Sequence, residues 1–177
     1  MTEKFDAIVI GTGQSGPSLA GRMTRDGMRV AIVERGKFGG TCVNTGCVPT
    51  KTLVASSYVA HMARRAAEYG IDTGPVKVDM KRVKARKEEV VAKSRNGVTR
   101  WMDGLANAKV YRGHGRFEGP HSVCVSGEFL EASKIVINTA VMAAVGQSRR
   151  FGSFCRMSGH WAICGHGTLP LKVSART

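Results

Sequence analysis

Residues 5–16, FDAIVIGTGQSG, decide the fold of this chain. Residues 5–10 form an apolar run with the length of a buried strand, and they lead directly into a G-x-G-x-x-G pattern. Leu19, Ala20 and Met23 then recur at helical spacing. A strand, a tight glycine turn and a helix in this order are typical of the first βαβ unit of a dinucleotide-binding fold.

The three glycines of this pattern, Gly11, Gly13 and Gly16, have separate roles in such a fold. The first permits the tight turn, the second lets a pyrophosphate approach the backbone, and the third lets helix and strand pack closely. A second apolar run, residues 29–33, ends in Glu34, which lies 18 residues after Gly16 and is suited to bind a ribose diol. The pattern therefore predicts a dinucleotide site, and the acid favours FAD or NAD over NADP. A glycine-rich turn without a ligand is the alternative.

A second motif, GGTCVNTGCVPTK at residues 39–51, carries Cys42 and Cys47. Five residues of continuous helix would separate the two Cα atoms by about 7.5 Å along the axis, beyond the roughly 4.4 to 6.8 Å that a disulfide tolerates. If the cysteines bond, the chain bends between them, for which Asn44 and Gly46 are suited. So close a pair between glycines indicates a redox dithiol. A buried structural pair or half of a metal site is the alternative.

Pro49 suits the first turn of a helix, which would place Cys47 at a helix N-terminus. There the helix dipole and the free N–H groups favour a thiolate and lower the thiol pKa. Lys51 lies one turn further, on the same side as Cys47. A redox dithiol directly after the ribose-binding strand favours FAD over NAD, because a flavin exchanges electrons with a thiolate.

The chain has 177 residues, enough for one main domain, with 27 Lys and Arg against 13 Asp and Glu and a net charge of +14. This excess raises the question of nucleic acid. The dense basic run at residues 77–87, however, lies in a helical pattern with Met80, Val83, Val90 and Val91, which favours a solvated helix face. We therefore expect no nucleic-acid partner. Because no stretch has the form of a secretory signal or a membrane span, we also expect a cytoplasmic protein without membrane contact.

Residues 5–139 resemble the class I pyridine nucleotide-disulfide oxidoreductases, which include glutathione reductase, dihydrolipoamide dehydrogenase and mercuric reductase. The motif that carries the resemblance is G-G-T-C-x4-C-x-P-[ST]-K at residues 39–51. Its form here, with residues 69–71 (YGI) and 78–80 (VDM), is most similar to the mercuric reductase-like branch. The resemblance implies an α/β fold, a Rossmann-like FAD-binding domain with a parallel sheet and a small β-meander.

The resemblance also implies roles for individual residues. Cys47 is expected to stack against the flavin, Cys42 to be the interchange thiol that faces substrate, and Lys51 to lie near the flavin ring. The backbone around His114 is expected to meet the adenine. The residues expected to bind FAD are Gly11, Gly13, Gly16, Glu34, Gly40, Thr41, Lys51, His114, Gly115 and Thr139.

In this family NAD(P)H reduces the flavin, the flavin reduces the disulfide through Cys47, and Cys42 then attacks a disulfide substrate or ligates Hg(II). Complete members are homodimers with a second dinucleotide fingerprint and a C-terminal interface domain that carries a His-Glu couple. This chain has one fingerprint, so we expect incomplete catalysis, poor solubility or weak FAD retention. A non-catalytic dinucleotide-binding module and a dihydrolipoamide dehydrogenase-like fragment are the alternatives.

Helical spacing predicts long helices over residues 50–70 and 79–105. Short strands are predicted near residues 109–117, 122–125, 128–132 and 134–138.

Residues 1–139 are expected to form the FAD-binding domain, and residues 140–177 an aberrant tail that is frameshifted, truncated or disordered. The reason is that Ala140 follows Thr139 where the family has a Thr-Gly pair. A cluster in the tail could be drawn as a zinc site or a basic metal or nucleic-acid binder: Cys155, His160, Cys164 and His166. Their spacing is not that of common zinc fingers, so we expect no metal.

Overall fold

The computed structural model describes residues 2–139, 154–157 and 160–163. Its contacts divide the chain into two units, residues 1–140 and 141–177. In the second unit, β7 (Phe154–Met157) and β8 (His160–Ile163) pair antiparallel. The tail residues considered as a zinc site lie outside the residues whose side chains the structure describes.

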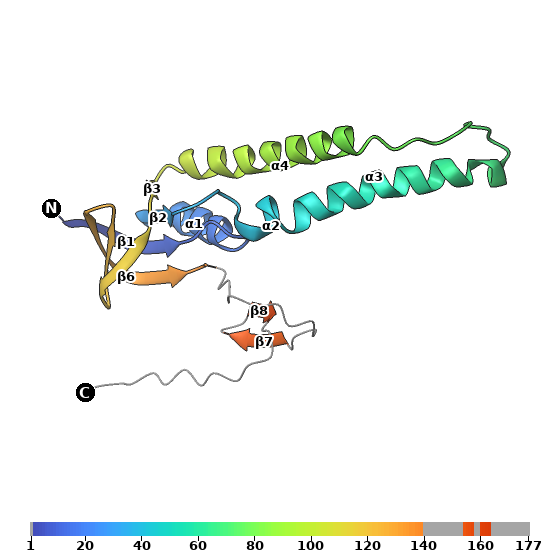
Figure 1. Cartoon of the computed structure of the whole chain (residues 1–177). Helices are drawn as coiled ribbons and strands as arrows, with labels where there is room; N and C mark the ends of the chain where they lie inside the picture. The colour runs from blue at the N-terminus through green and yellow to red at the C-terminus, as the bar shows by residue number, and fades with distance from the viewer. Residues whose placement is uncertain (1, 140–153, 158–159, 164–177) are drawn as a thin grey trace. The chain divides into compact units, whose positions relative to one another are not determined.

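The first unit is built on a six-stranded sheet in the order β3-β2-β1-β6-β5-β4 (Figure 1). Four neighbouring strands are parallel: β3 (Ala108–Arg112), β2 (Val30–Glu34), β1 (Thr2–Ile10) and β6 (Glu128–Ile137). Antiparallel pairing then adds β5 (Ser122–Val125) and β4 (Gly115–Gly119) beyond β6. The α/β fold with a parallel sheet and a small meander is confirmed.

Alternate residues of β1 supply two separate cores, one on each face of the sheet. Ala7 and Val9 pack in the cluster that contains Ala20 of α1 (Gly16–Arg25) and Met102. Ile8 packs on the other face, in the cluster that contains Tyr111, Val123, Val125 and Leu130. Burial on both faces explains why β1 reads as a continuous apolar run instead of an alternating one.

Two long helices form a hairpin beside the sheet. α2 (Gly40–Asn44) leads into α3 (Cys47–Arg65), which ends through a 3₁₀ turn, η1 (Ala66–Tyr69), at Gly70 in the left-handed conformation with φ of 74°. α4 (Met80–Asp103) then returns alongside α3, as Figure 1 shows. Its N-cap, Asp79, accepts hydrogen bonds from the backbone N–H groups of Lys81 and Arg82, which stabilises the start of the helix.

One sequence prediction is wrong in detail. The strands expected near residues 128–132 and 134–138 are one strand, β6, because pairing with β1 runs from Phe129 to Ile137 without a break in the strand. Met80, one of the residues at helical spacing, is the first residue of α4 and is 55% exposed.

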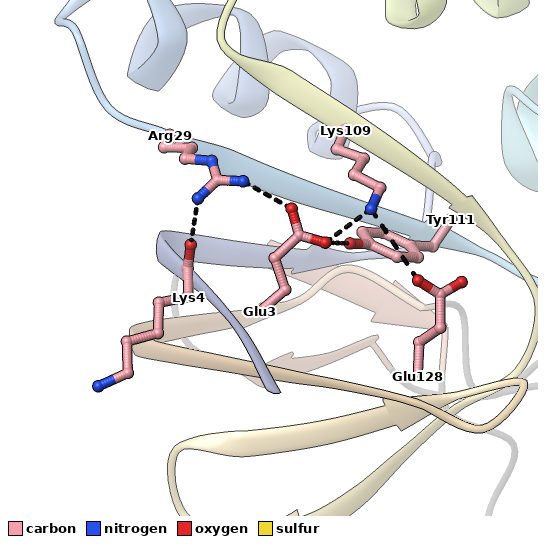
Figure 2. Close-up of polar contacts among 6 residues, drawn as sticks. All are labelled: Glu3, Lys4, Arg29, Lys109, Tyr111 and Glu128. Carbon is pink, nitrogen blue, oxygen red and sulfur yellow. Dashed lines mark hydrogen bonds and ion pairs between the residues drawn. The ribbon is translucent and has the colours of Figure 1, made fainter. Parts of the chain in front are cut away.

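A polar cluster around Glu3 lies at the amino-terminal ends of the parallel strands (Figure 2). The Glu3 carboxylate accepts hydrogen bonds from the Arg29 guanidinium at 2.6 Å, the Lys109 ammonium at 2.6 Å and the Tyr111 hydroxyl at 2.7 Å. Lys109 also lies 3.9 Å from a Glu128 oxygen. The cluster therefore connects the starts of β1, β2, β3 and β6.

None of the helices in the described part of the chain combines the length and apolarity required to cross a membrane.

Candidate functional site

A cavity of about 380 Å³ opens at the carboxyl ends of the parallel strands. This edge of an open α/β sheet is where ligands bind in such folds. The cavity brings together predicted site residues that are far apart in the sequence: Gly11, Gly13, Glu34, His114, Gly115 and Thr139. Gly16 is buried at the start of α1 behind the loop, while Gly40, Thr41 and Lys51 belong to the adjoining α2–α3 segment.

The first glycine of the loop cannot carry a side chain. Gly11 has a φ of 99°, and a Cβ placed on it would lie 2.4 Å from the Asn138 carbonyl oxygen. A Cβ on Gly16 would lie 2.3 Å from the carbonyl oxygen of Gly11. Both contacts involve backbone, which cannot move aside as a flexible side chain can, so the loop has this shape only with glycine at these positions.

The side chain of Asn138, the residue after β6, lies against the same loop. In the amide orientation that pairs donors with acceptors, its Oδ1 accepts from Gly16 N–H at 2.8 Å and Gly13 N–H at 3.3 Å. Its Nδ2 then donates to Ser15 Oγ at 2.8 Å. Asn138 therefore anchors the glycine loop to the end of β6.

The Glu34 carboxylate is fixed by three hydrogen bonds. Thr12 donates its N–H and its hydroxyl to Oε2 at 2.8 and 2.7 Å, and Gly36 N–H donates to Oε1 at 2.8 Å. These bonds orient the acid at the cavity and occupy three of the roughly four lone-pair positions of the carboxylate, which leaves about one, on Oε1, for a ribose hydroxyl.

The turn between β3 and β4 completes the cavity. Gly113 N–H donates to the Glu34 carbonyl at 3.0 Å, and a Cβ on Gly115 would lie 3.2 Å from Val33 Cγ1. The His114 side chain is exposed. Tight backbone packing at Gly113 and Gly115 brings this turn beside Glu34.

The glycine loop touches the segment that carries the cysteines. Gly39 N–H donates to the Thr12 carbonyl at 3.1 Å, and a Cβ on Gly40 would lie 2.8 Å from the Gly13 Cα. Gly40 also has a φ of 59°, which disfavours a side chain further. The two sequence motifs therefore form one continuous site.

Cys42 and Cys47 are free thiols on two successive helices. Cys42 is half-buried in α2, and Cys47 is exposed as the first residue of α3, so the predicted bend between the cysteines and the helix start at Cys47 are confirmed. The adjacent Cys47 sulfur, which interacts with the Cys42 thiol, raises the pKa of Cys42, and partial burial raises it further. The Lys51 ammonium acts on the same pKa in the opposite direction.

These residues fit the phosphate and ribose part of a dinucleotide. Glycines leave the backbone open at Gly11 and Gly13, α1 points its N-terminus at the loop, and Glu34 lines the same cavity. Within the described residues, no group of three or more histidine, cysteine, aspartate or glutamate side chains is arranged to hold a metal ion.

Sequence reasoning missed two residues of this site, Thr12 and Asn138. Thr12 occupies a variable position of the glycine pattern, which gives no signal that its hydroxyl contacts Glu34. Asn138 offered a usable signal, because a polar residue directly after a buried parallel strand lies at the ligand-binding edge of the sheet.

The chain matches the model of the pyridine nucleotide-disulphide oxidoreductase family over residues 5–150. A dihydrolipoyl dehydrogenase from Bacillus subtilis is 38% identical over 120 residues, which are 68% of this chain and 25% of that protein. A mercuric reductase from Lysinibacillus sphaericus is 31% identical over 147 residues, which are 82% of this chain and 27% of that protein. Among solved structures, the HOCl-induced flavoprotein disulfide reductase RclA from Escherichia coli has a TM-score of 0.63 and 35% identity, over 76% of this chain and 28% of RclA.

The curated relatives are considerably longer than the region that they share with this chain. The matched region spans 25 to 43% of their length. Most of those compared are dihydrolipoyl dehydrogenases, so the similarity does not single out the mercuric reductase-like branch. The matched family is described as pyridine nucleotide-disulphide oxidoreductases and RclA as a flavoprotein, in agreement with the FAD cofactor predicted from the sequence.

Proposed function

The chain belongs to the pyridine nucleotide-disulphide oxidoreductase family, and from this we propose that residues 1–139 are the FAD-binding and redox-dithiol segment of an NAD(P)H-dependent flavoprotein disulfide reductase. One observation carries the proposal: the contact of Gly40 with Gly13, together with the Gly39–Thr12 hydrogen bond. It joins a dinucleotide site to a pair of adjacent thiols, which is the arrangement that electron transfer between them requires.

Cys42 and Cys47 divide the thiol chemistry between them. The Cys42 thiolate attacks one sulfur of a disulfide substrate, the substrate S–S bond breaks, and one thiolate leaves and takes up a proton. The Cys47 thiolate then attacks the Cys42 sulfur of the mixed disulfide and displaces the second thiolate, which leaves a Cys42–Cys47 disulfide. Flavin that NAD(P)H has first reduced would supply the two electrons that, with two protons, return this disulfide to the dithiol.

The raised pKa of Cys42 affects the first step, because only the thiolate is a nucleophile. Attack by Cys42 therefore requires a general base or a nearby positive charge. Lys51 supplies a charge within the described residues, and the His-Glu couple implied by the family resemblance would supply the base in a complete, homodimeric enzyme.

We propose a dithiol–disulfide couple as the substrate class, because dihydrolipoyl dehydrogenases, whose name describes oxidation of a dithiol, recur among the relatives and RclA is described as a disulfide reductase. Hg(II) is a second candidate, supported by the mercuric reductase of Lysinibacillus sphaericus and by the affinity of paired thiolates for soft metal ions.

Anaerobic reductive titration of the full chain, loaded with FAD and then freed of unbound flavin, tests the proposal. We expect uptake of about four electrons per chain, two by the flavin and two by the disulfide. The variant Cys47→Ser should take up about two, whereas Cys124→Ser, which alters a cysteine of β5 away from the site, should behave as the wild type. Failure to bind flavin, or equal uptake by the wild type and Cys47→Ser, would overturn the assignment.

A further inference from the structure

Asn44 lies between the two cysteines in the sequence and uses both ends of its amide. Its Nδ2 donates to the carbonyls of Phe38 and Gly40, each at 2.9 Å, and more weakly to that of Lys37 at 3.4 Å. These bonds fold the end of α2 back onto the chain that precedes it. The position of Cys42, two residues earlier in α2, depends on them.

The other end of the Asn44 amide is held by α4. Arg95 donates from its guanidinium to Asn44 Oδ1 at 3.3 Å across a sequence separation of 51 residues, at a partly buried position. This contact fastens the helix that carries Cys42 to α4.

A second arginine of α4 holds the helix that carries Cys47. Arg86 donates to the Thr52 carbonyl at 3.2 Å and to Ser56 Oγ at 3.3 Å, both in α3. One helix therefore binds both cysteine-bearing helices through separate side chains.

We propose that Arg95, together with Arg86, is a positioning residue for the redox pair, holding α2 and α3 against α4 so that Cys42 and Cys47 stay within reach of each other. The proposal rests on the redox function proposed above. Neither arginine is assigned contact with substrate or flavin.

The effect of these two arginines is measurable as a change in the equilibrium constant for forming the Cys42–Cys47 disulfide. Oxidised glutathione oxidises the dithiol in two exchanges, in which the protein S–S bond forms, the glutathione S–S bond breaks, and two glutathione thiols are released with the two protons. Thiols held close together form this bond more readily, because less conformational freedom is lost on closure. Loss of the Arg95 contact with Asn44 should therefore favour the dithiol over the disulfide.

The decisive variant is Arg95→Met, which keeps an unbranched apolar chain but removes the donor. We expect the equilibrium constant for forming the Cys42–Cys47 disulfide to fall about tenfold in glutathione buffers, as follows from loss of a hydrogen bond from a charged donor. Differential alkylation and peptide mass spectrometry of the full chain, without added FAD, would measure it. Arg95→Lys, which keeps a donor, should recover part of the loss.

Lys93→Met is the matched control, because it removes the same charge from an exposed position of α4 two residues away. It should leave the equilibrium unchanged, and thermal unfolding of each variant would show that it is folded. Asn44→Ala combined with Arg95→Met should cost no more than Asn44→Ala alone, since both remove one contact.

Two results would overturn the positioning role of Arg95. One is an unchanged equilibrium constant for disulfide formation in Arg95→Met, and the other is an equal fall of that constant in Lys93→Met. These are distinct from failure of the proposed function, in which the wild-type chain itself would form no Cys42–Cys47 disulfide at any glutathione ratio.

Discussion

Thr12 and Glu34, 22 residues apart, are joined twice, because the Thr12 hydroxyl and the Thr12 N–H both donate to the same carboxylate oxygen at 2.7 and 2.8 Å. The Thr12 hydroxyl also accepts from Gly39 N–H at 3.3 Å. A single buried side chain thus orients the acid of the cavity and receives the chain that leads to Cys42. The nucleotide end and the thiol end of the site share this residue.

Replacing Thr12 with valine tests that connection. Thr12→Val keeps the shape of the side chain but removes the hydroxyl, which should weaken FAD or ADP binding and destabilise the fold by about 1 to 2 kcal/mol. Thr12→Ser, which retains the hydroxyl, should lie close to the wild type. Isothermal titration with ADP and chemical denaturation would measure the two effects, and equal behaviour of the valine and serine variants would contradict the role of the hydroxyl.

Asn138 should matter more for the glycine loop than for the strand that precedes it. Asn138→Ala leaves the N–H groups of Gly13 and Gly16 without their side-chain acceptor, at an expected cost of about 1 to 3 kcal/mol in the free energy of unfolding. Asn96→Ala, on the exposed face of α4, is the control and should change stability little. Urea unfolding of both variants would decide, and comparable losses would contradict an anchoring role for Asn138.

Alanine substitutions at Gly11 and Gly27 distinguish the cost of a left-handed backbone conformation from the cost of a steric clash. Both glycines have positive φ values, 99° and 84°, but a Cβ on Gly27 meets nothing within 4 Å, whereas one on Gly11 meets the Asn138 backbone. Gly27→Ala should cost about 1 to 2 kcal/mol from the left-handed backbone alone, and Gly11→Ala about 3 kcal/mol or more. Denaturation midpoints would compare them; similar losses would mean that the loop moves away from Asn138.

Glu3 should make the amino-terminal edge of the sheet sensitive to acid. Lys109 and Tyr111, which hydrogen-bond to the Glu3 carboxylate, lower its pKa below the ordinary 4.5. A carboxyl whose folded pKa is depressed stabilises the fold above its unfolded pKa, and this contribution is lost as the pH falls through the folded pKa.

Glu3→Gln should therefore lower the melting temperature by roughly 2 to 4 °C at pH 7. The difference from the wild type should shrink as the pH falls from 4.5 through the lower folded pKa of Glu3, because below that folded pKa the Glu3 side chain is as neutral as glutamine. Calorimetry across this range would measure it, with the exposed Glu131→Gln as control. A difference that stays constant with pH would show that the charge of Glu3 is not what the cluster uses.

Removal of the Cys47 thiol should change the pKa of Cys42. Because Cys47 is the main cause of the raised pKa of Cys42, Cys47→Ala should lower that pKa, and alkylation of Cys42 by iodoacetamide should begin at a lower pH. Peptide-level mass spectrometry distinguishes Cys42 from the other cysteines. An unchanged pH profile would indicate that the sulfurs do not interact in solution.

The sequence by itself determined the parts of this protein whose signal is local. The apolar run before Gly11, the glycine spacing and the acid at Glu34 predicted a nucleotide-binding α/β fold, because backbone sterics and hydrophobic burial act over short stretches. The pattern around Cys42 and Cys47 likewise predicted two thiols at a bend before a helix.

Only the tertiary structure decided which side chains support the site. Nothing in the local sequence of Arg95 indicates Asn44, and nothing near Ser15 indicates Asn138, since each pair is brought together by sheet order and helix packing over 51 and 123 residues. A single continuous strand β6 was decided in the same way, by pairing with β1. Hydrogen bonds between distant segments depend on where the chain returns, and local propensity carries no information about that return.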